Sequence, residues 1–279
     1  MARIVTVAIA IAALLSACSS GSTDAAAPTL TAAPTTTTIE PARQQVVPAR
    51  TRFTVEGDAV DLICRGHGRM PVVFLAGGRE PATVWNGLIA SLGDDVFTCV
   101  FNRPGTTGDE VKQPPTELTT PRAVADALAE TLEQAMLGPR IILVGHSAGG
   151  DSALVFGADH PLRVAGAVLF DPSVPPLVPR GEWERIGFRS ADTAQEVAAV
   201  TDWPDVPLVV LSGDADLVVK NHEATATEER EWLAAHRRYA ELSTAGVQRE
   251  VPGTNHFVYL TAPEVATGTL REVLRTARG

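Results

Sequence analysis

Short apolar runs alternate with amphipathic segments along the chain from residue 50 onward. The runs are mostly uninterrupted, which is typical of strands buried on both faces. Several of the segments between them carry apolar residues at helical spacing. This alternation predicts a mostly parallel sheet with helices on both faces. The central strands are expected in "PVVFLAGG", "DVFTCVFNRPG", "RIILVG", "RVAGAVLFDPS" and "VPLVVLSGDAD".

Two segments depart from this rhythm. Residues 50–55 and 58–65 alternate polar and apolar side chains around a turn at Gly57-Asp58, which favours an antiparallel pair at the sheet edge. Residues 172–207 are rich in proline and contain one short helical stretch. Because this insertion lies between two strands, we expect a small cap at the end of the sheet where the loops gather. The alternative is a long connecting loop that only covers an edge.

A possible nucleophile lies between the predicted strand at residues 141–145 and the helical segment that follows. Gly145, Ser147 and Gly149 form a G-x-S-x-G sequence, which is weak by itself but stands here in the strand–turn–helix context that it requires. A sharp turn would place the Ser147 hydroxyl above the strand ends. The glycines on either side of it would leave room for the strand and the helix to pass close to each other. The amide of Ala148 would then lie at a helix N-terminus, where negative charge is favoured. The alternative is a tight turn with an inert serine.

A serine hydroxyl needs a base to take its proton and an acid to orient that base. His256 follows the last predicted strand, on a loop that could return over Ser147. Asp216 follows the strand before it and is the expected acid, with Asp214 and Asp171 as alternatives. The resulting order of serine, aspartate and histidine is the one expected for this kind of sheet.

Together these residues resemble the α/β-hydrolase superfamily over Arg50–Gly279, through the stretches "LAGG", "FNRPGTTGD", "GHSAGG", "LSGDADLVV" and "GTNHF". The resemblance implies an eight-stranded, mostly parallel sheet, with Ser147 as nucleophile, Asp216 as acid and His256 as base. It also implies an oxyanion hole formed by the amides of Gly78 and Ala148, and no metal or organic cofactor. A serine nucleophile, rather than an aspartate, argues against the epoxide hydrolase and dehalogenase branches.

The same resemblance makes neighbours of the strands that carry Cys64 and Cys99. Adjacent strands lie about 4.7–4.9 Å apart, and a disulfide needs Cα atoms within about 4.4–6.8 Å of each other. We therefore expect a Cys64–Cys99 disulfide, and the alternative is two buried thiols.

The first 49 residues predict export rather than a folded domain. A basic residue and an apolar stretch of about a dozen residues have the character of a signal peptide. The stretch ends in "LSAC", which resembles the lipobox of bacterial lipoproteins, so residues 1–17 would be removed and Cys18 would be lipidated. The alternative is an ordinary signal peptide with a chance cysteine. Residues 18–49 are dominated by Thr, Ala and Pro and predict a disordered tether.

The net charge of −10 argues against nucleic acid as a partner, because phosphate binding needs an excess of Lys and Arg. We expect an exported serine hydrolase, anchored to the outer face of the membrane, that cleaves small-molecule or lipid esters through an acyl-enzyme. An amidase or peptidase of the same fold is one alternative. A binding lipoprotein without turnover is the other, and the oligomeric state stays open.

Overall fold

The computed structural model describes residues 50–103, 118–214 and 225–278. The predicted signal peptide, Cys18 and the tether lie outside the described residues, and so does Asp216. In the described part, no helix is long and apolar enough to cross a bilayer.

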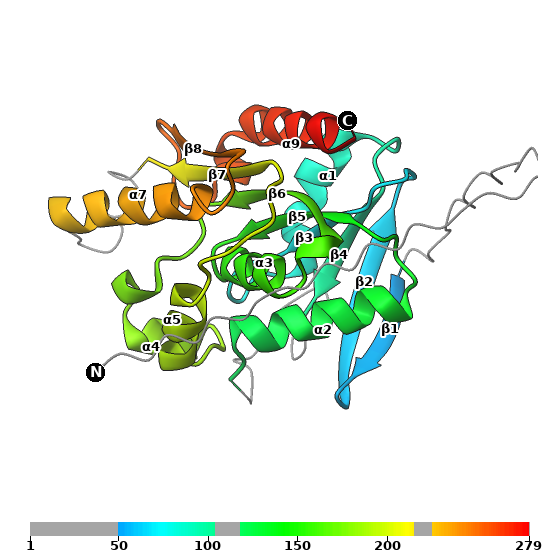
Figure 1. The fold of residues 1–279 in the computed structure, drawn as a ribbon, viewed down its shortest axis with the longest axis horizontal. Coiled ribbons are helices and arrows are strands. Elements are labelled where there is room, and N and C mark those ends of the chain that lie inside the picture. The colour runs from blue at the N-terminus through cyan, green and yellow to red at the C-terminus, as the bar shows by residue number, and fades with distance from the viewer. Residues whose placement is uncertain (1–49, 104–117, 215–224, 279) are drawn as a thin grey trace, which may run out of the picture. The chain divides into compact units, whose positions relative to one another are not determined.

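An eight-stranded sheet forms the centre of the fold, in the order β1-β2-β4-β3-β5-β6-β7-β8 (Figure 1). Strands β3 to β8 run parallel, whereas β1 and β2 are antiparallel to each other, and β2 is antiparallel to β4. The predicted eight-stranded, mostly parallel sheet with an antiparallel edge is therefore confirmed. The strands are β1 Arg50–Val55, β2 Asp58–Arg65, β3 Val72–Leu75, β4 Thr98–Asn102, β5 Ile141–His146, β6 Val164–Phe170, β7 Leu208–Gly213 and β8 Gly246–Val251.

Helices cover both faces of this sheet, and α2 and α7 begin at residues that cap them. Helix α2 begins at Pro121, after Thr120 accepts a hydrogen bond from the amide of Ala123. Helix α7 begins after a capping box formed by Thr225 and Glu228. The helices are α1 Asn86–Leu92, α2 Pro121–Gln134, α3 Ala148–Asp159, α4 Arg180–Arg185, α5 Ser190–Ala198, α7 Ala226–Ala240, α8 Val258–Thr261 and α9 Pro263–Arg278, with 3-10 turns η1 Ala82–Trp85, η2 Pro161–Arg163 and η3 Pro175–Leu177.

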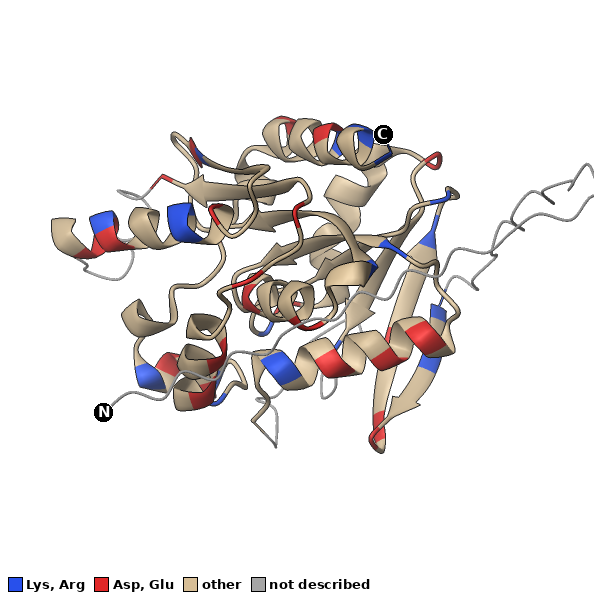
Figure 2. Ribbon diagram, in the orientation of Figure 1, with Lys and Arg blue, Asp and Glu red and all other residues tan. Residues whose placement is uncertain are grey.

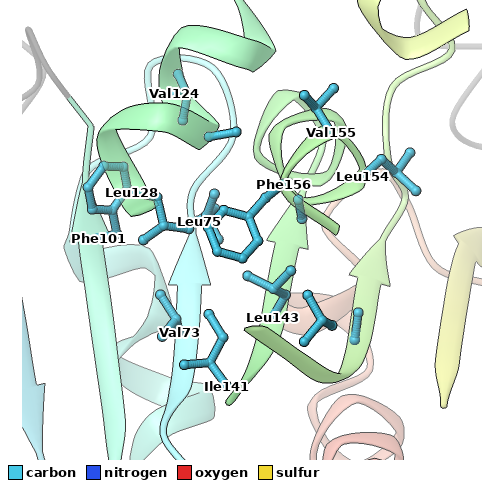
Figure 3. Close-up of a cluster of buried hydrophobic side chains, with 14 of the residues drawn as sticks. Val73, Leu75, Phe101, Val124, Leu128, Ile141, Leu143, Leu154, Val155 and Phe156 are labelled. Carbon is cyan, nitrogen blue, oxygen red and sulfur yellow. The ribbon is translucent and has the colours of Figure 1, made fainter. Parts of the chain in front are cut away.

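Alternate residues of the central strands enter two separate hydrophobic clusters. In β3, Val73 and Leu75 pack beneath α2 and α3 (Figure 3), whereas Val72 and Phe74 point to the face covered by α1 and α9. This is the period of two that a strand imposes, with both faces buried. Strands β3, β5, β6 and β7 contain no Asp, Glu, Lys or Arg, and Figure 2 shows these residues in the helices, loops and edge strands.

The antiparallel edge carries the predicted disulfide. Cys64 of β2 lies directly opposite Cys99 of β4, and the two are joined by a disulfide with Cα atoms 4.0 Å apart. Further along β2, the buried carboxylate of Asp61 is held by Arg50 and by Arg52, each at 2.8 Å. The ion pairs join β1 to β2, and the disulfide joins this edge pair to β4.

The insertion at residues 172–207 is a packed segment that contains η3, α4 and α5. Trp183 and Phe188 are fully buried within it. Trp203 donates a hydrogen bond of 2.9 Å from its indole nitrogen to the carbonyl of Leu154 in α3. The segment is therefore anchored to α3, the helix that follows Ser147, and it begins after the carboxyl end of β6.

Candidate active site

Ser147 lies at the sharp junction of β5 and α3. Its φ of 51° and ψ of −127° lie where a non-glycine residue is strained, and such strain is concentrated at functional sites. A Cβ on Gly145 would lie 2.7 Å from the carbonyl oxygen of Gly149, and one on Gly149 would overlap the carbonyl oxygens of Leu75 and Ala76. Both glycines are thus needed for the close passage of β5, α3 and the end of β3.

The imidazole of His256 is held by Asp171. Its Nδ1 atom lies 2.6 Å from Oδ2 of Asp171, with the Asp171 side chain fully buried and that of His256 29% exposed. Asp214 faces elsewhere, since its Oδ2 accepts a hydrogen bond of 2.9 Å from the amide of Gly253. Among the described residues, which exclude Asp216, the acid bonded to His256 is Asp171, the second alternative of the sequence analysis after Asp214. Strands β6 and β7 end side by side, so an acid at either end can reach the same histidine.

Asp171 is also fixed on its other oxygen. Its Oδ1 accepts hydrogen bonds from the amide of Gly213 at 2.9 Å and from the indole nitrogen of Trp232 at 3.2 Å. Burial raises the pKa of Asp171, but the hydrogen bond and charge of His256, together with the Gly213 amide, outweigh it and the pKa falls below its usual value. Asp171 is thus an ionised acceptor, so the proton on His256 resides on Nδ1 and leaves Nε2 as a base.

A second histidine, His236, binds the backbone next to Asp171. His236 is fully buried, with its Nε2 2.7 Å from the carbonyl oxygen of Pro172 and its Nδ1 2.8 Å from the hydroxyl of Ser212. The carbonyl can only accept, so Nε2 donates and Nδ1 accepts from Ser212. Burial lowers the pKa of His236, so the ring is neutral and orients the backbone just after Asp171.

Ser147 and His256 open into one cavity of about 520 Å³. Among the described residues, the Ser147 hydroxyl makes no hydrogen bond to the imidazole, and such bonds often tighten only when substrate binds. The wall is mainly apolar and comes largely from the 172–207 insertion. Its apolar members are Leu177, Val178, Pro179, Trp183, Ile186, Trp232 and Phe257.

The predicted oxyanion residues lie beside the serine. Gly78 lines the same cavity, and Ala148 is the first residue of α3, whose amide has no partner within the helix. Arg103 donates a hydrogen bond of 2.9 Å to the carbonyl of Gly77 and fixes the loop that carries Gly78. The 172–207 insertion packs tightly against this loop, because a Cβ on Gly78 would lie 2.5 Å from Cδ1 of Ile186.

Several residues of the site carry no recognisable signal in the sequence. Trp232 and His236 lie in a charged helix whose pattern predicts only a solvated face. Glu80 and His146 line the cavity and bond to each other, although they are 66 positions apart. Over the described ranges, no group of three His, Cys, Asp or Glu side chains is arranged to hold a metal.

Comparison with known proteins supports the fold. A family profile described as alpha/beta hydrolase fold matches residues 70–202. A search of curated protein sequences finds no match. Similar solved structures include a thermophilic esterase from Thermogutta terrifontis, with 21% identity, a TM-score of 0.57 and coverage of 82% of this chain and 99% of that one.

Two further structures show how widely this fold is used. Carboxylesterase CesB from Bacillus subtilis is 15% identical, with a TM-score of 0.58 and coverage of 81% of this chain and 90% of that one. Epoxide hydrolase CorEH is also 15% identical, with a TM-score of 0.60 and coverage of 81% and 98%. The chain has the α/β-hydrolase fold, and its chemistry must be argued from its own site.

Proposed function

We propose that the protein is a serine hydrolase that cleaves carboxylic esters through an acyl-enzyme intermediate. The observation that carries the proposal is the strained Ser147 at a cavity that also holds His256, whose Nδ1 is bonded to the buried Asp171. This is the set of parts that nucleophilic acyl transfer needs: a nucleophile, a base and an acid that orients the base.

In the proposed reaction, Ser147 Oγ attacks the ester carbonyl while its proton passes to Nε2 of His256. The negative charge that forms on the carbonyl oxygen is bound by the amides of Ala148 and Gly78, each worth about 3–4 kcal/mol in the transition state. The intermediate expels the alcohol, which takes the proton from His256. Water then attacks the acyl-enzyme by the same route in reverse, and the carboxylic acid leaves.

The cavity favours an uncharged, apolar acyl or alcohol group. Its wall is mostly apolar, and its charged members are Glu80, Glu182, Glu228 and Arg185, three acids against one base. Arg185 pairs with Glu182, and Glu228 caps helix α7. An amide substrate is the second candidate, since the same parts cleave both bonds. A serine nucleophile disfavours the epoxide chemistry of one structural neighbour.

A fluorophosphonate probe tests the nucleophile directly. The purified full chain should be labelled once, and Ser147→Ala should abolish labelling. Ser91→Ala is the matched control, because Ser91 lies on α1 and bonds to Leu88 and Thr267, away from the cavity. An unlabelled wild-type protein, or equal labelling of Ser147→Ala, would overturn the proposal. p-Nitrophenyl esters and anilides with the same acyl groups then separate esterase from amidase.

We also propose that lipidation of Cys18 anchors the enzyme to the outer face of the cell membrane, as the lipobox-like "LSAC" suggests. Stable anchoring requires more than a single acyl chain. Cys18→Ala should release the protein into the soluble fraction. Retention of this variant on membranes would contradict the proposed anchor.

A further inference from the structure

A buried carboxylate that the proposed reaction does not use joins the two loops on which that reaction depends. Glu80 follows the oxyanion loop, and its side chain is only 11% exposed. Its Oε2 accepts a hydrogen bond of 2.6 Å from the amide of Gly77 and lies 2.9 Å from Nδ1 of His146. Its Oε1 accepts a hydrogen bond of 3.0 Å from the hydroxyl of Tyr259. Glu80 therefore joins its own loop, through Gly77, to two segments that are distant in the sequence.

His146 carries the connection onward to the histidine loop. Its Nε2 lies 3.0 Å from the backbone carbonyl oxygen of His256. A carbonyl can only accept, so this nitrogen is protonated and donates. The ring also packs at a tilt against that of His256, with centroids 4.6 Å apart. An unbroken path of hydrogen bonds thus runs from the Gly77 amide through Glu80 and His146 to the backbone of His256.

The charge states favour a strong connection. Burial raises the pKa of Glu80, but the charge and hydrogen bond of His146, with the hydrogen bonds from Gly77 and Tyr259, bring it below its usual value. An ionised Glu80 is a charged partner for Nδ1 of His146, 2.9 Å away. Charge-assisted hydrogen bonds of this kind are roughly twice as strong as neutral ones.

The residues along this path of hydrogen bonds are closely packed. A Cβ on Gly77 would lie 2.8 Å from Oε2 of Glu80 and 2.9 Å from Nδ1 of His146. The buried Arg103 donates to the Gly77 carbonyl on the other side, and burial lowers its pKa to about 10, so it remains a cation at neutral pH. The predicted oxyanion loop is therefore held by hydrogen bonds at both the amide and the carbonyl of Gly77.

We propose that Glu80 is a positioning residue that, through His146, fixes the oxyanion loop and the His256 loop in one geometry for acyl transfer. This inference rests on the proposed hydrolase function. A misplacement of about 1 Å can cost about 100-fold in rate, and both loops must be placed to that precision at once. Glu80 itself touches neither the nucleophile nor the reacting carbonyl.

The test compares Glu80→Gln with a buried carboxylate that is remote from the cavity. Glutamine has the size of glutamate, but its NH2 group would face one of the hydrogen-bond donors around position 80. The kcat of Glu80→Gln for a p-nitrophenyl ester, counted per titrated active site, should fall about 10- to 100-fold with KM little changed. Affinity for a trifluoromethyl ketone, which forms an oxyanion on Ser147, should fall in parallel. Asp61→Asn, which breaks the ion pairs of β2, should lower Tm and leave kcat unchanged.

A double-mutant cycle separates positioning from stability. His146→Gln breaks the same path of hydrogen bonds at the residue after Glu80. Because either substitution already interrupts the path, the kcat of the double variant should be no lower than that of the slower single variant. It also provides the readout if Glu80→Gln does not fold. Glu80→Gln with wild-type kcat and inhibitor affinity, or fully additive losses in the cycle, would overturn the positioning role. An inert, unlabelled wild-type protein would instead remove the hydrolase proposal on which this role rests.

Discussion

Replacing Asp171 by asparagine is the sharpest test of the site, because Asp171 is bonded to His256 in the structure whereas the sequence analysis expects Asp216 as the acid. Asparagine keeps the shape and tolerates the positive φ of 43° at this position. Its carbonyl oxygen can still accept from Gly213 and Trp232. Its amide group would then face Nδ1 of His256 across a distance that is 2.6 Å in the wild-type structure. The fold should survive while the hydrogen bond that orients the base is reversed.

The reversal has a calculable cost. An amide donor makes Nδ1 an acceptor, so the proton moves to Nε2, where it prevents removal of the Ser147 proton. In serine hydrolases with such a reversed tautomer, kcat falls by up to about 10⁴-fold. We expect a loss of roughly 10³- to 10⁴-fold here, about 4–5.5 kcal/mol in the activation barrier, with KM nearly unchanged.

The assay is ester hydrolysis per active site, with circular dichroism to confirm the fold. Asp214→Asn and Asp216→Asn are the matched controls, because each alters an acid that follows β7. Asp214→Asn should retain most activity, since its carboxylate binds Gly253 instead of His256. If Asp171→Asn kept more than a tenth of wild-type kcat while Asp216→Asn lost more than 100-fold, our assignment of the acid would be refuted.

Three further predictions concern stability. Replacing Cys64 and Cys99 together by alanine should lower the free energy of unfolding by about 2–4 kcal/mol, since the bridge closes a separation of 35 residues; an unchanged urea midpoint would contradict this. Gly149→Ala should cost about 1–3 kcal/mol through overlap with backbone carbonyls, whereas Gly268→Ala, with open space around it in α9, should raise Tm slightly. The pKa of His236 is lower in the folded protein than the 6.5 of the unfolded chain, so as pH drops the unfolded state binds a proton on His236 before the folded state does. The free energy of unfolding should therefore decrease below about pH 6.5. Urea titrations at several pH values should show a smaller decrease for His236→Gln than for the wild-type protein.

Local sequence features were sufficient for the framework of the fold. Uninterrupted apolar runs predicted the central strands, because a strand buried on both faces has no polar side to alternate with. The glycines around Ser147 predicted the turn, since only small residues permit the close crossing of β5, α3 and β3. His256 was singled out by its position after the last strand. These features depend on short stretches of chain and on a period of two or 3.6 residues.

Only the tertiary structure decided which acid reaches His256 and what supports it. Asp171 and Asp214 both follow parallel strands, and their separation in sequence says nothing about which carboxylate turns toward the imidazole. The indole of Trp232 and the backbone amide of Gly213, which bind Asp171 from two other elements, hold its carboxylate in that orientation. In the same way, Glu80 and His146 met only when the oxyanion loop and the turn after β5 came together. Local pattern fixes which strands form and where they end, but the meeting of side chains at those ends depends on long-range packing, which no short stretch of sequence contains.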